Sequence, residues 1–346
     1  MLYGMALFFS FCLSVLLVPL VKQLAIKIGA VDCPNERKVH TKVMPRLGGL
    51  AIFISFIIGS TLFIHDVERI FPIVAGSSLI ITLGILDDKY QLSAMVKFFG
   101  QIGAAIITIL GGIQMEYITL FSGEILQFGF FTIPLTIFWI VGITNAINLI
   151  DGLDGLAAGV SSIALFTIFG LSLSMGNFLV ALISILLLGG TLGFLIFNFH
   201  PAKIFMGDTG SLFLGYMISV LSILGFTKSV TFFSLIIPII ILAIPIIDTL
   251  FAIVRRLVHK KPLSAPDKNH IHHSLMKLGY THRQTVVIIY MMSGLFNLAA
   301  VLFTNSTVLG SVLVLVTLLI LIEVIVETTG LISENYRPLL NIIRRK

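Results

Sequence analysis

The chain has 346 residues, of which 57% are apolar and 11% are charged, and its mean hydropathy is +1.09. A soluble domain carries about 25% charged residues. This composition therefore excludes a water-soluble globular enzyme, a disordered chain and a disulfide-rich secreted scaffold, and it predicts an integral membrane protein. The net charge of +6 would suit a nucleic-acid partner, but the placement of the cations along the chain argues against one.

Eleven apolar runs approach the roughly 20 residues that a helix needs to cross the hydrocarbon core. In chain order they are residues 5–27, 48–64, 70–86, 93–113, 130–147, 156–173, 178–197, 211–226, 232–251, 286–303 and 308–326. The first run has no basic leader and ends in Lys22 and Lys27, so we expect a retained span and no cleaved signal peptide. The sequence predicts an all-α, polytopic membrane protein of about eleven transmembrane helices, with residues 1–346 in a single integral membrane domain.

Lys and Arg divide unevenly between the two sides of this predicted bundle. Of the 22 cations, all but Arg69 and Lys228 fall into one set of segments, residues 22–47, 87–97, 145–155, 198–209, 253–285 and 327–346. The positive-inside rule places this set in the cytoplasm, with the N-terminus outside and the C-terminus inside.

An acidic pair, Asp87 and Asp88, ends the third run in the stretch LGILDDKYQ. Two neighbouring carboxylates repel each other, by about 1 kcal/mol in water and about 4 kcal/mol at an effective dielectric constant of 20. Taken alone, the pair is equally well interpreted as a solvated helix end or as a cation site. Mg²⁺ suits the second interpretation, because it prefers a few carboxylates together with phosphate oxygens.

Polar residues recur every third position in the stretch NAINLIDGLDG, as Asn145, Asn148, Asp151 and Asp154. On one straight helix their directions would drift by about 180° from first to last, so they could not face a common point. Two interleaved glycines permit a break in the helix. A broken helix end that lines a cytoplasmic cavity explains the pattern better than a simple polar loop.

The stretch NFHPAKIFMGDTGS contains a helix stop, Pro201, followed by Asp208 at the start of the next run. Asp208, Thr209 or Ser211 could cap that helix, which is a common use of such residues. A carboxylate at a helix N-terminus is also held ionised, as a metal ligand needs to be. Lys203 could pair with phosphate; Phe205 is either a core residue or an aromatic lid over a nucleobase.

A histidine cluster follows a basic run near the chain's end: His270, His272 and His273 in PDKNHIHH, with Asp248 upstream in PIIDTLFAIVRR. No Cys or Glu pattern completes a zinc site. The imidazoles can donate hydrogen bonds to phosphate oxygens or move protons, and the basic run serves the positive-inside rule and anionic lipid.

These clusters all belong to the predicted cytoplasmic set, which suits phosphoryl transfer between an anionic soluble substrate and an anionic lipid with a divalent metal. A secondary transporter is the alternative from another class, but its ionisable groups are expected near the bilayer midplane and between inverted repeats. A structural scaffold would leave the clustered Asp and His residues unexplained.

Five motifs, in this order, resemble those of the polyprenyl-phosphate N-acetylhexosamine-1-phosphate transferases. They are DCPNERKVHTKVMPRLGG at 32–49, LDDKYQ at 86–91, NAINLIDGLDG at 145–155, NFHPAKIFMGDTGS at 198–211 and DKNHIHH at 267–273. The resemblance implies a transferase that moves a sugar-1-phosphate from a UDP-sugar to a polyprenyl phosphate, releases UMP and uses Mg²⁺ or Mn²⁺. Its partners would be these substrates and the membrane but no nucleic acid, and a homodimer is kept as a candidate assembly.

The resemblance also implies roles for individual residues. Eight are expected to be catalytic: Asp87, Asp88, Asp151, Asp154, Asp208, His270, His272 and His273. Seven are expected to bind substrate: Lys38, His40, Arg46, Asn148, Asn198, Lys203 and Phe205. Asp208 is the expected main metal ligand, with Asp151 beside it, and Asp87 or Asp88 is the expected base next to the lipid phosphate. Asn198 and Phe205 match the uracil pocket, and the histidines match the loop that holds the diphosphate and sugar.

Two details of these motifs bear on the metal site and on the substrate. The family's acidic motif often reads DDxxD, but position 91 is Gln91 here, so we expect no metal role for it. The HIHH loop resembles the branch that uses UDP-N-acetylglucosamine and undecaprenyl phosphate, at the start of a teichoic acid or O-antigen type of glycan. Another UDP-N-acetylhexosamine or UDP-N-acetylmuramyl-pentapeptide is the alternative donor. We expect the site on the cytoplasmic face of a bacterial cell membrane.

Overall fold

The computed structural model describes residues 1–32, 43–119, 124–227, 235–258, 260, 262, 267, 269–331, 338–339 and 341. The chain divides into two compact units, residues Met1–Leu235 and Ile236–Lys346. The single transferase domain predicted for the whole chain stays a prediction.

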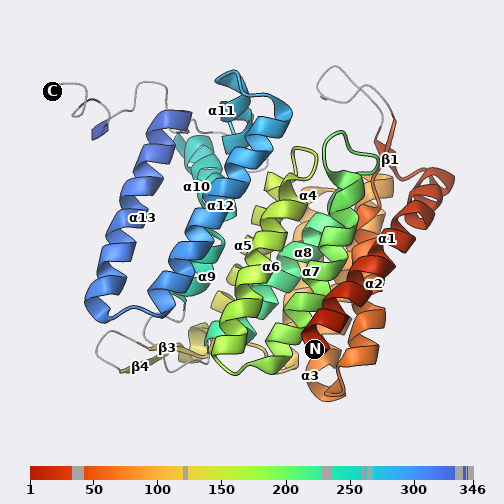
Figure 1. Ribbon diagram of the computed structural model, residues 1–346, viewed down its shortest axis with the longest axis horizontal. Coiled ribbons are helices and arrows are strands. Elements are labelled where there is room, and N and C mark those ends of the chain that lie inside the picture. The colour runs from red at the N-terminus through yellow and green to blue at the C-terminus, as the bar shows by residue number, and fades with distance from the viewer. Residues whose placement is uncertain are drawn as a thin grey trace. The chain divides into compact units, whose positions relative to one another are not determined.

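The first unit is a bundle of apolar helices (Figure 1). Their bounds are α1 Leu2–Ile28, α2 Gly48–Phe63, α3 Val67–Tyr90, α4 Ala94–Leu110, α5 Thr132–Ile150, α6 Leu156–Ser174, α7 Phe178–Asn198 and α8 Gly207–Ser222, which continues as a π-helical turn, Ile223–Thr227. Helix α8 packs against α2, α3, α5 and α6, and α7 packs against α1, α2 and α6. Helix α8 is therefore central in this unit, and Asp208 lies in its first turn.

Glycines allow the backbones of α2 and α3 to approach the first turn of α8. A Cβ atom on Gly49 would clash with the backbone of Gly210, and one on Gly84 would clash with the backbone of Thr209. The start of α2 and the last two turns of α3 therefore lie directly against the N-terminus of α8.

Two short antiparallel hairpins complete the first unit. Strand β1 (Val31–Asp32) pairs with β2 (Met44–Pro45), and β3 (Tyr117–Thr119) pairs with β4 (Ile125–Gln127). A 3₁₀ turn, Gly129–Phe131, precedes α5. The β3–β4 hairpin and the N-terminus of α1 lie at one end of the bundle, and β1 lies at the other end (Figure 1).

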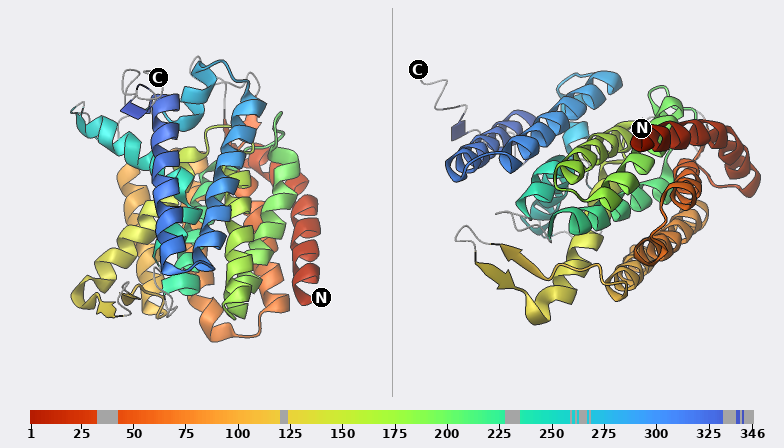
Figure 2. Two further views of the ribbon diagram at one scale, coloured as in Figure 1. Left: turned by 60° about the vertical axis from the view of Figure 1, so that its left-hand side comes forward. Right: turned by 60° about the horizontal axis from the view of Figure 1, so that its bottom comes forward.

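The second unit contains α9 Ile236–Ile241, α10 Ala243–Val258, α11 Ile271–Lys277, α12 His282–Thr304 and α13 Val308–Thr329. Helix α12 packs against α9, α10, α11 and α13, and its long antiparallel contact with α13 is visible in Figure 2. The run predicted over 232–251 is divided between α9 and α10.

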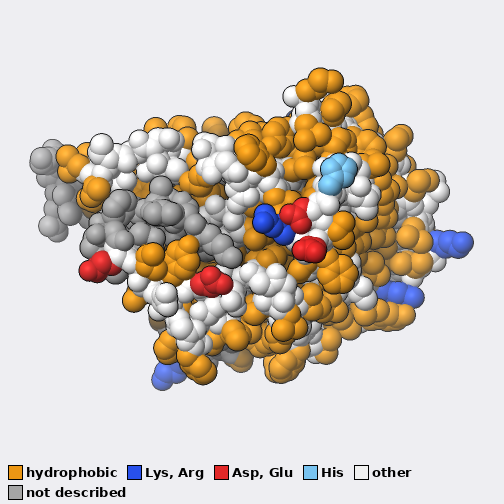
Figure 3. Space-filling model, turned by 90° about the horizontal axis from the view of Figure 1, so that it is seen from below, with side chains coloured by type: hydrophobic (Ala, Val, Ile, Leu, Met, Phe, Trp, Pro, Cys, Tyr) orange, Lys and Arg blue, Asp and Glu red, His pale blue; other side chains and the backbone are white. Residues whose placement is uncertain are grey.

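Within the described residues, eight helices are long and apolar enough to cross a membrane, and α2 and α4 are shorter apolar helices. Figure 3 shows hydrophobic side chains over much of one face of the molecule, with few charged groups between them. The prediction of an all-α polytopic membrane protein is confirmed. The count of eleven spans and the sidedness of the termini stay predictions.

Candidate active site

Asp88, at the end of α3, caps the N-terminus of α8. Its carboxylate accepts hydrogen bonds from the backbone N–H groups of Asp208 at 2.9 Å and Thr209 at 3.0 Å, and from the Thr209 hydroxyl at 2.6 Å. These donors are among the groups that a helix N-terminus leaves without a partner in its own helix. Because Asp88 satisfies them from another helix, the side chain of Asp208 is not needed as a cap and its carboxylate faces cations.

Two cations lie against these carboxylates. The Lys97 ammonium is 3.2 Å from Oδ2 of Asp87 and 2.9 Å from Oδ2 of Asp208. The Arg46 guanidinium lies 3.5 Å from Oδ1 of Asp88 and 3.8 Å from Oδ1 of Asp208. Asp87 and Asp88 are only 7% and 4% exposed, which excludes the interpretation of a solvated helix end. We call Asp87, Asp88, Asp208, Arg46 and Lys97 the acidic cluster.

Asp151 follows α5 directly and interacts electrostatically with this cluster. Burial raises the pKa of its carboxyl to about 7, the negative charge of Asp208 adds to the effect, and Arg46 opposes it. For Arg46, burial lowers the pKa, but the carboxylates of Asp88 and Asp208 outweigh burial and raise it. Arg46 is thus a permanent cation, whereas Asp151 would ionise more readily if a further cation were bound nearby.

The predicted break in the NAINLIDGLDG motif is confirmed. Helix α5 ends at Ile150, and α6 begins after Gly155, which has a positive φ of 78°. Asn148, in the last turn of α5, donates a hydrogen bond of 2.8 Å to the hydroxyl of Ser211 in α8. One turn earlier, Asn145 exchanges amide hydrogen bonds with Gln101 of α4. Polar side chains of this motif therefore tie α5 to α4, which carries Lys97, and to α8, which carries Asp208.

Hydrogen bonds join the loop after α5 to the loop after α7. Asn198 accepts from the N–H of Gly155 at 3.0 Å and donates to the carbonyl of Ile204 at 3.0 Å. In return, Asp154 lies 2.9 Å from Nδ1 of His200 and accepts from the N–H of Ala202 at 3.1 Å. The side chains of Asn198 and Asp154 are thus engaged in positioning these loops.

The first-loop motif adjoins the loop after α7. Phe205 donates its N–H to the carbonyl of Pro45 at 2.8 Å, and its own carbonyl accepts from Gly48 at 3.0 Å. This pairing delivers Arg46 to the acidic cluster and leaves Phe205 half-buried and Lys203 exposed. Lys38 and His40, predicted in the same motif, lie outside the described residues.

In the second unit, residues 267–273 carry the HIHH motif and lead into α11, and we call this segment the histidine loop. Its described residues are anchored twice to α10. Asp248 accepts from the N–H of Ile271 at 2.8 Å, and its other oxygen lies 2.8 Å from Nδ1 of His270. Arg255 donates to Asp267 at 2.6 and 3.1 Å and to the carbonyl of Leu331 at 2.7 Å. The loop therefore has a fixed conformation over the described residues around the HIHH motif.

The three imidazoles lie together. The rings of His270 and His272 are parallel within 3° with centroids 5.8 Å apart, and those of His272 and His273 are 4.2 Å apart. Burial lowers the pKa of His272 to about 3, with His273 adding to the shift. Burial and the neighbouring His270 also lower the pKa of His273. His272 is therefore neutral at neutral pH.

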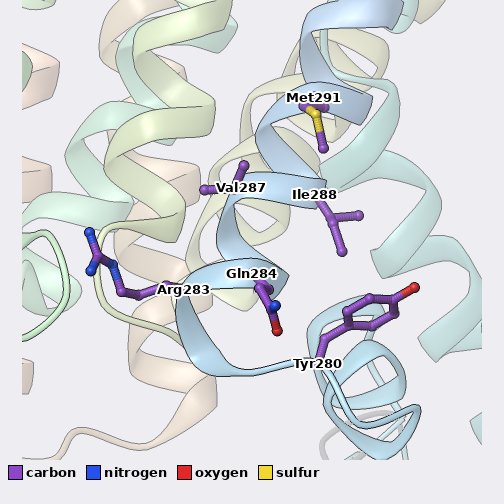
Figure 4. Close-up of a pocket in the computed structure, with 6 residues that line it drawn as sticks. All are labelled: Tyr280, Arg283, Gln284, Val287, Ile288 and Met291. Atoms are coloured by element: carbon purple, nitrogen blue, oxygen red, sulfur yellow. The ribbon is translucent and has the colours of Figure 1, made fainter.

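A separate hollow of about 310 Å³ lies along the first half of α12 (Figure 4). It is mostly apolar, and none of the predicted site residues lines it; its residues are Tyr280, Arg283, Gln284, Val287, Ile288 and Met291. We assign it no role in the chemistry.

Sequence reasoning missed several residues of these arrangements. The sequence assigns no role to Lys97, which lies in a predicted cytoplasmic segment, or to Asp248. The signal available for both was a lone charge within an otherwise apolar stretch, which in a membrane protein indicates a function by default. Thr209 and Ser211 bond to residues of other helices, and Arg255 bonds to Asp267 and Leu331 outside its helix; the sequence indicates none of these partners.

The fold is that of a polytopic membrane protein with buried polar clusters. A family model described as glycosyl transferase family 4 matches residues 70–226. A relative in Bacillus subtilis, named a probable undecaprenyl-phosphate N-acetylglucosaminyl 1-phosphate transferase, is 53% identical, and the match covers 96% of this chain and 94% of the relative. A decaprenyl-phosphate N-acetylglucosaminephosphotransferase of Mycolicibacterium smegmatis is 38% identical, with 82% and 78% covered. A phospho-N-acetylmuramoyl-pentapeptide-transferase of Halalkalibacterium halodurans is 33% identical, with 86% and 96% covered.

The chain belongs to glycosyl transferase family 4, and it is a phospho-N-acetylhexosamine transferase. The resemblance drawn from the five motifs is thereby confirmed at the level of the family.

Proposed function

We propose that this enzyme transfers N-acetylglucosamine-1-phosphate from UDP-N-acetylglucosamine to a polyprenyl phosphate, such as undecaprenyl phosphate, and releases UMP. The observation that carries the proposal is the pair of carboxylates, Asp87 and Asp208, on either side of the Lys97 ammonium, with Arg46 beside Asp208. Such a mixture of oxygen ligands and cations suits a reaction between two anionic phosphate groups. The names of the relatives in Bacillus and Mycolicibacterium support the same sugar and the same class of acceptor.

A divalent ion, Mg²⁺ or Mn²⁺, fits the first unit, because the atoms available in the acidic cluster are carboxylate oxygens, which hard cations prefer. We assign this ion to Asp208 and Asp151, whose charges already interact. When bound, it would offset the negative charge of the donor's diphosphate.

Of the two neighbouring carboxylates, Asp87 is the better base. Both oxygens of Asp88 are occupied by α8 and its Thr209 hydroxyl, so protonation of Asp88 would disturb the helix cap. Asp87 instead contacts the ammonium of Lys97, which lies at the end of a long and flexible side chain. We assign to Asp87 the removal of the residual proton from the acceptor phosphate, and to Asp88 the placement of Asp208.

The nucleotide and sugar contacts follow from the resemblance and stay a proposal. Phe205 is half-buried, as a platform for uracil needs to be, and Lys203 is exposed and able to meet a phosphate. Asn198 and Asp154 serve this site by holding its two loops, and Asn148 ties α5 to α8. The histidine loop, His270, His272 and His273, is assigned to the diphosphate and sugar; Lys38 and His40 keep their predicted role in substrate binding.

We place the site on the cytoplasmic face of a bacterial membrane, on the strength of the cation distribution. The exposed Gln91, next to the acidic cluster in sequence, gives a test. In a cysteine-free background, Gln91→Cys should react with an impermeant maleimide in inside-out vesicles and stay unlabelled in intact cells. Labelling in intact cells would overturn the orientation.

The donor is tested with purified protein in nanodiscs that contain undecaprenyl phosphate and Mg²⁺. We expect UMP release with UDP-N-acetylglucosamine and little with UDP-N-acetylmuramyl-pentapeptide, the donor class indicated by the name of the Halalkalibacterium relative. The reverse preference would replace the proposed donor. Absence of UMP release with every UDP-N-acetylhexosamine would favour the transporter alternative. The downstream glycan, of teichoic acid or O-antigen type, and the homodimer stay predictions.

A further inference from the structure

The histidine loop rests on a buried carboxylate to which the proposed reaction gives no role. Asp248 lies in the middle of α10 and is 1% exposed. One of its oxygens accepts from the backbone N–H of Ile271, and the other lies 2.8 Å from Nδ1 of His270. A carboxylate is costly to bury unless it is hydrogen-bonded, and these two contacts meet that need.

The geometry fixes the protonation pattern of the His270 ring. A carboxylate only accepts hydrogen bonds, so Nδ1 of His270 must carry the proton that points at Asp248. In the neutral ring, Nε2 is then the bare nitrogen, and it makes no hydrogen bond within the described part of the chain. A carboxylate that holds one imidazole nitrogen in this way sets both the tautomer and the ring orientation for a partner at the other nitrogen.

His272 and His273, which lie in α11, differ in this respect from His270, the residue that precedes the helix. His272 and His273 make no hydrogen bond to a carboxylate of the described residues, and the pKa of each is lowered. The charged and titratable groups that interact with His270 include Asp248 from α10, Asp267 from the loop, and His272 and His273 from α11. His270 is thus the imidazole of the motif that a carboxylate contacts directly.

We propose that Asp248 is a positioning residue of the transfer reaction, which holds His270 in the Nδ1–H tautomer so that Nε2 is presented to a phosphate oxygen of the nucleotide-sugar. This inference rests on the proposed function. Nε2 takes up a proton from water as the anionic phosphate arrives, the ring becomes a cation held between Asp248 and the phosphate oxygen, and its Nε2–H donates to that oxygen. No bond to substrate is made or broken by either residue.

The matched control is Asp267, the other carboxylate that anchors this loop. It accepts from Arg255 and from the N–H of Asn269 but makes no hydrogen bond to a histidine ring. Asp248→Asn and Asp267→Asn each remove one negative charge that holds the histidine loop, the first from α10 and the second from the loop itself. Asparagine offers one acceptor oxygen, which the backbone N–H of Ile271 needs, so in Asp248→Asn the amide NH2 group faces Nδ1 of His270 and disfavours a proton there.

The first measurement needs no substrate. Protein labelled with ¹⁵N-histidine is placed in nanodiscs, and the His270 ring signals are identified by their loss in His270→Gln. We expect the Nδ1–H tautomer in the wild type and in Asp267→Asn, and a shift toward Nε2–H in Asp248→Asn. An Nε2–H ring in the wild type would overturn the proposal.

The second measurement is steady-state turnover with UDP-N-acetylglucosamine and undecaprenyl phosphate. We expect Asp248→Asn to lower kcat by about 10–100-fold, the usual cost of losing a carboxylate behind a functional histidine, with a nearly unchanged KM for the donor. Asp248→Glu, which keeps a carboxylate, should recover part of the loss. The proposal would be overturned if Asp248→Asn and Asp267→Asn lowered kcat equally. It would also be overturned if Asp248→Asn changed the His270 tautomer and kept the wild-type kcat. Asp248 would then be only a loop anchor.

Failure of the proposed function gives a different result. Wild-type protein would then release no UMP, while the tautomer measured without substrate would still decide whether Asp248 sets the protonation of His270. If Asp248→Asn does not fold, the wild-type tautomer and the turnover of Asp248→Glu decide the proposal.

Discussion

Lys97 and Asp208 lie 111 positions apart in the chain, and the ammonium of Lys97 is 2.9 Å from Oδ2 of Asp208. The same ammonium is 3.2 Å from Asp87, so a single cation from α4 bridges the carboxylates of α3 and α8. A divalent metal would compete for these oxygens, since it binds the same type of ligand. We therefore expect two uses of Lys97: it balances the carboxylates when no metal is bound, and it would be available to a phosphate if a metal took these oxygens.

Replacement of Lys97 by Gln should separate these two uses. Without the competing ammonium, we expect Lys97→Gln to bind Mn²⁺ more tightly than the wild type in the absence of substrate, as measured by electron paramagnetic resonance of free Mn²⁺. We also expect turnover to fall at least about tenfold, because a cation near the phosphates is lost. Lys89→Gln, which removes an exposed lysine at the end of the neighbouring helix, is the control. Unchanged Mn²⁺ affinity in Lys97→Gln would contradict the competition.

Asp208→Asn should abolish turnover and leave the fold intact. The cap of α8 is supplied by Asp88, so loss of the Asp208 charge leaves this cap in place, while it weakens the pairing with Lys97 and the proposed metal site. Asp88→Ala should behave differently, because it leaves buried donors of α8 without an acceptor, at a cost of about 1–3 kcal/mol. Thermal unfolding in detergent and UMP release together distinguish the two variants. Near wild-type turnover of Asp208→Asn with an unchanged Mg²⁺ requirement would remove Asp208 from the metal site.

The raised pKa of Asp151 predicts that the stability of the metal-free protein depends on pH. Its pKa is raised to about 7 in the folded chain, whereas an unfolded Asp ionises near pH 4. The folded state therefore holds more protons between these values, and stability falls as the pH rises from about 4 through about 7. We expect Asp151→Asn to lose less thermal stability than the wild type between pH 5 and pH 8 in EDTA, and Mg²⁺ to reduce the wild-type loss. If thermal stability depended on pH in the same way in both proteins, the pKa of Asp151 would not be raised by folding.

Sequence reasoning predicted what depends on local pattern. Runs of about 20 apolar residues became helices, and the glycines of NAINLIDGLDG mark a real break. Asp208 was correctly placed at a helix N-terminus, but its capping alternative failed because the cap comes from Asp88, 120 positions away. The bridge from Lys97 to Asp208 and the pair of Asp248 with His270 likewise join distant segments. Such contacts depend on how helices pack, which one sequence does not encode in any local signal.

The acidic cluster also bears on how the phosphoryl group moves. A covalent route would use an aspartate of the cluster as the nucleophile, and each of its three aspartates is paired with Lys97 or Arg46. A carboxylate whose charge is offset by a cation is a weaker nucleophile than a free one. The acceptor's phosphate monoester is already largely anionic near neutral pH, since its second pKa is about 6, and it needs little activation.

We therefore predict direct attack of the polyprenyl phosphate on the β-phosphorus of the UDP-sugar, with UMP as the leaving group. Without the acceptor lipid, the enzyme should release no UMP and should exchange no labelled UMP into UDP-N-acetylglucosamine. A single displacement should also invert a donor made chiral at the β-phosphorus, whereas two displacements would retain its configuration. Asp87→Asn should slow this transfer by about 10²–10⁴-fold, the usual contribution of a general base, without introducing exchange. Exchange in the absence of lipid, together with retained configuration, would instead require a phosphosugar bound to an aspartate, and Asp87 would be the first residue to examine by trapping and mass spectrometry.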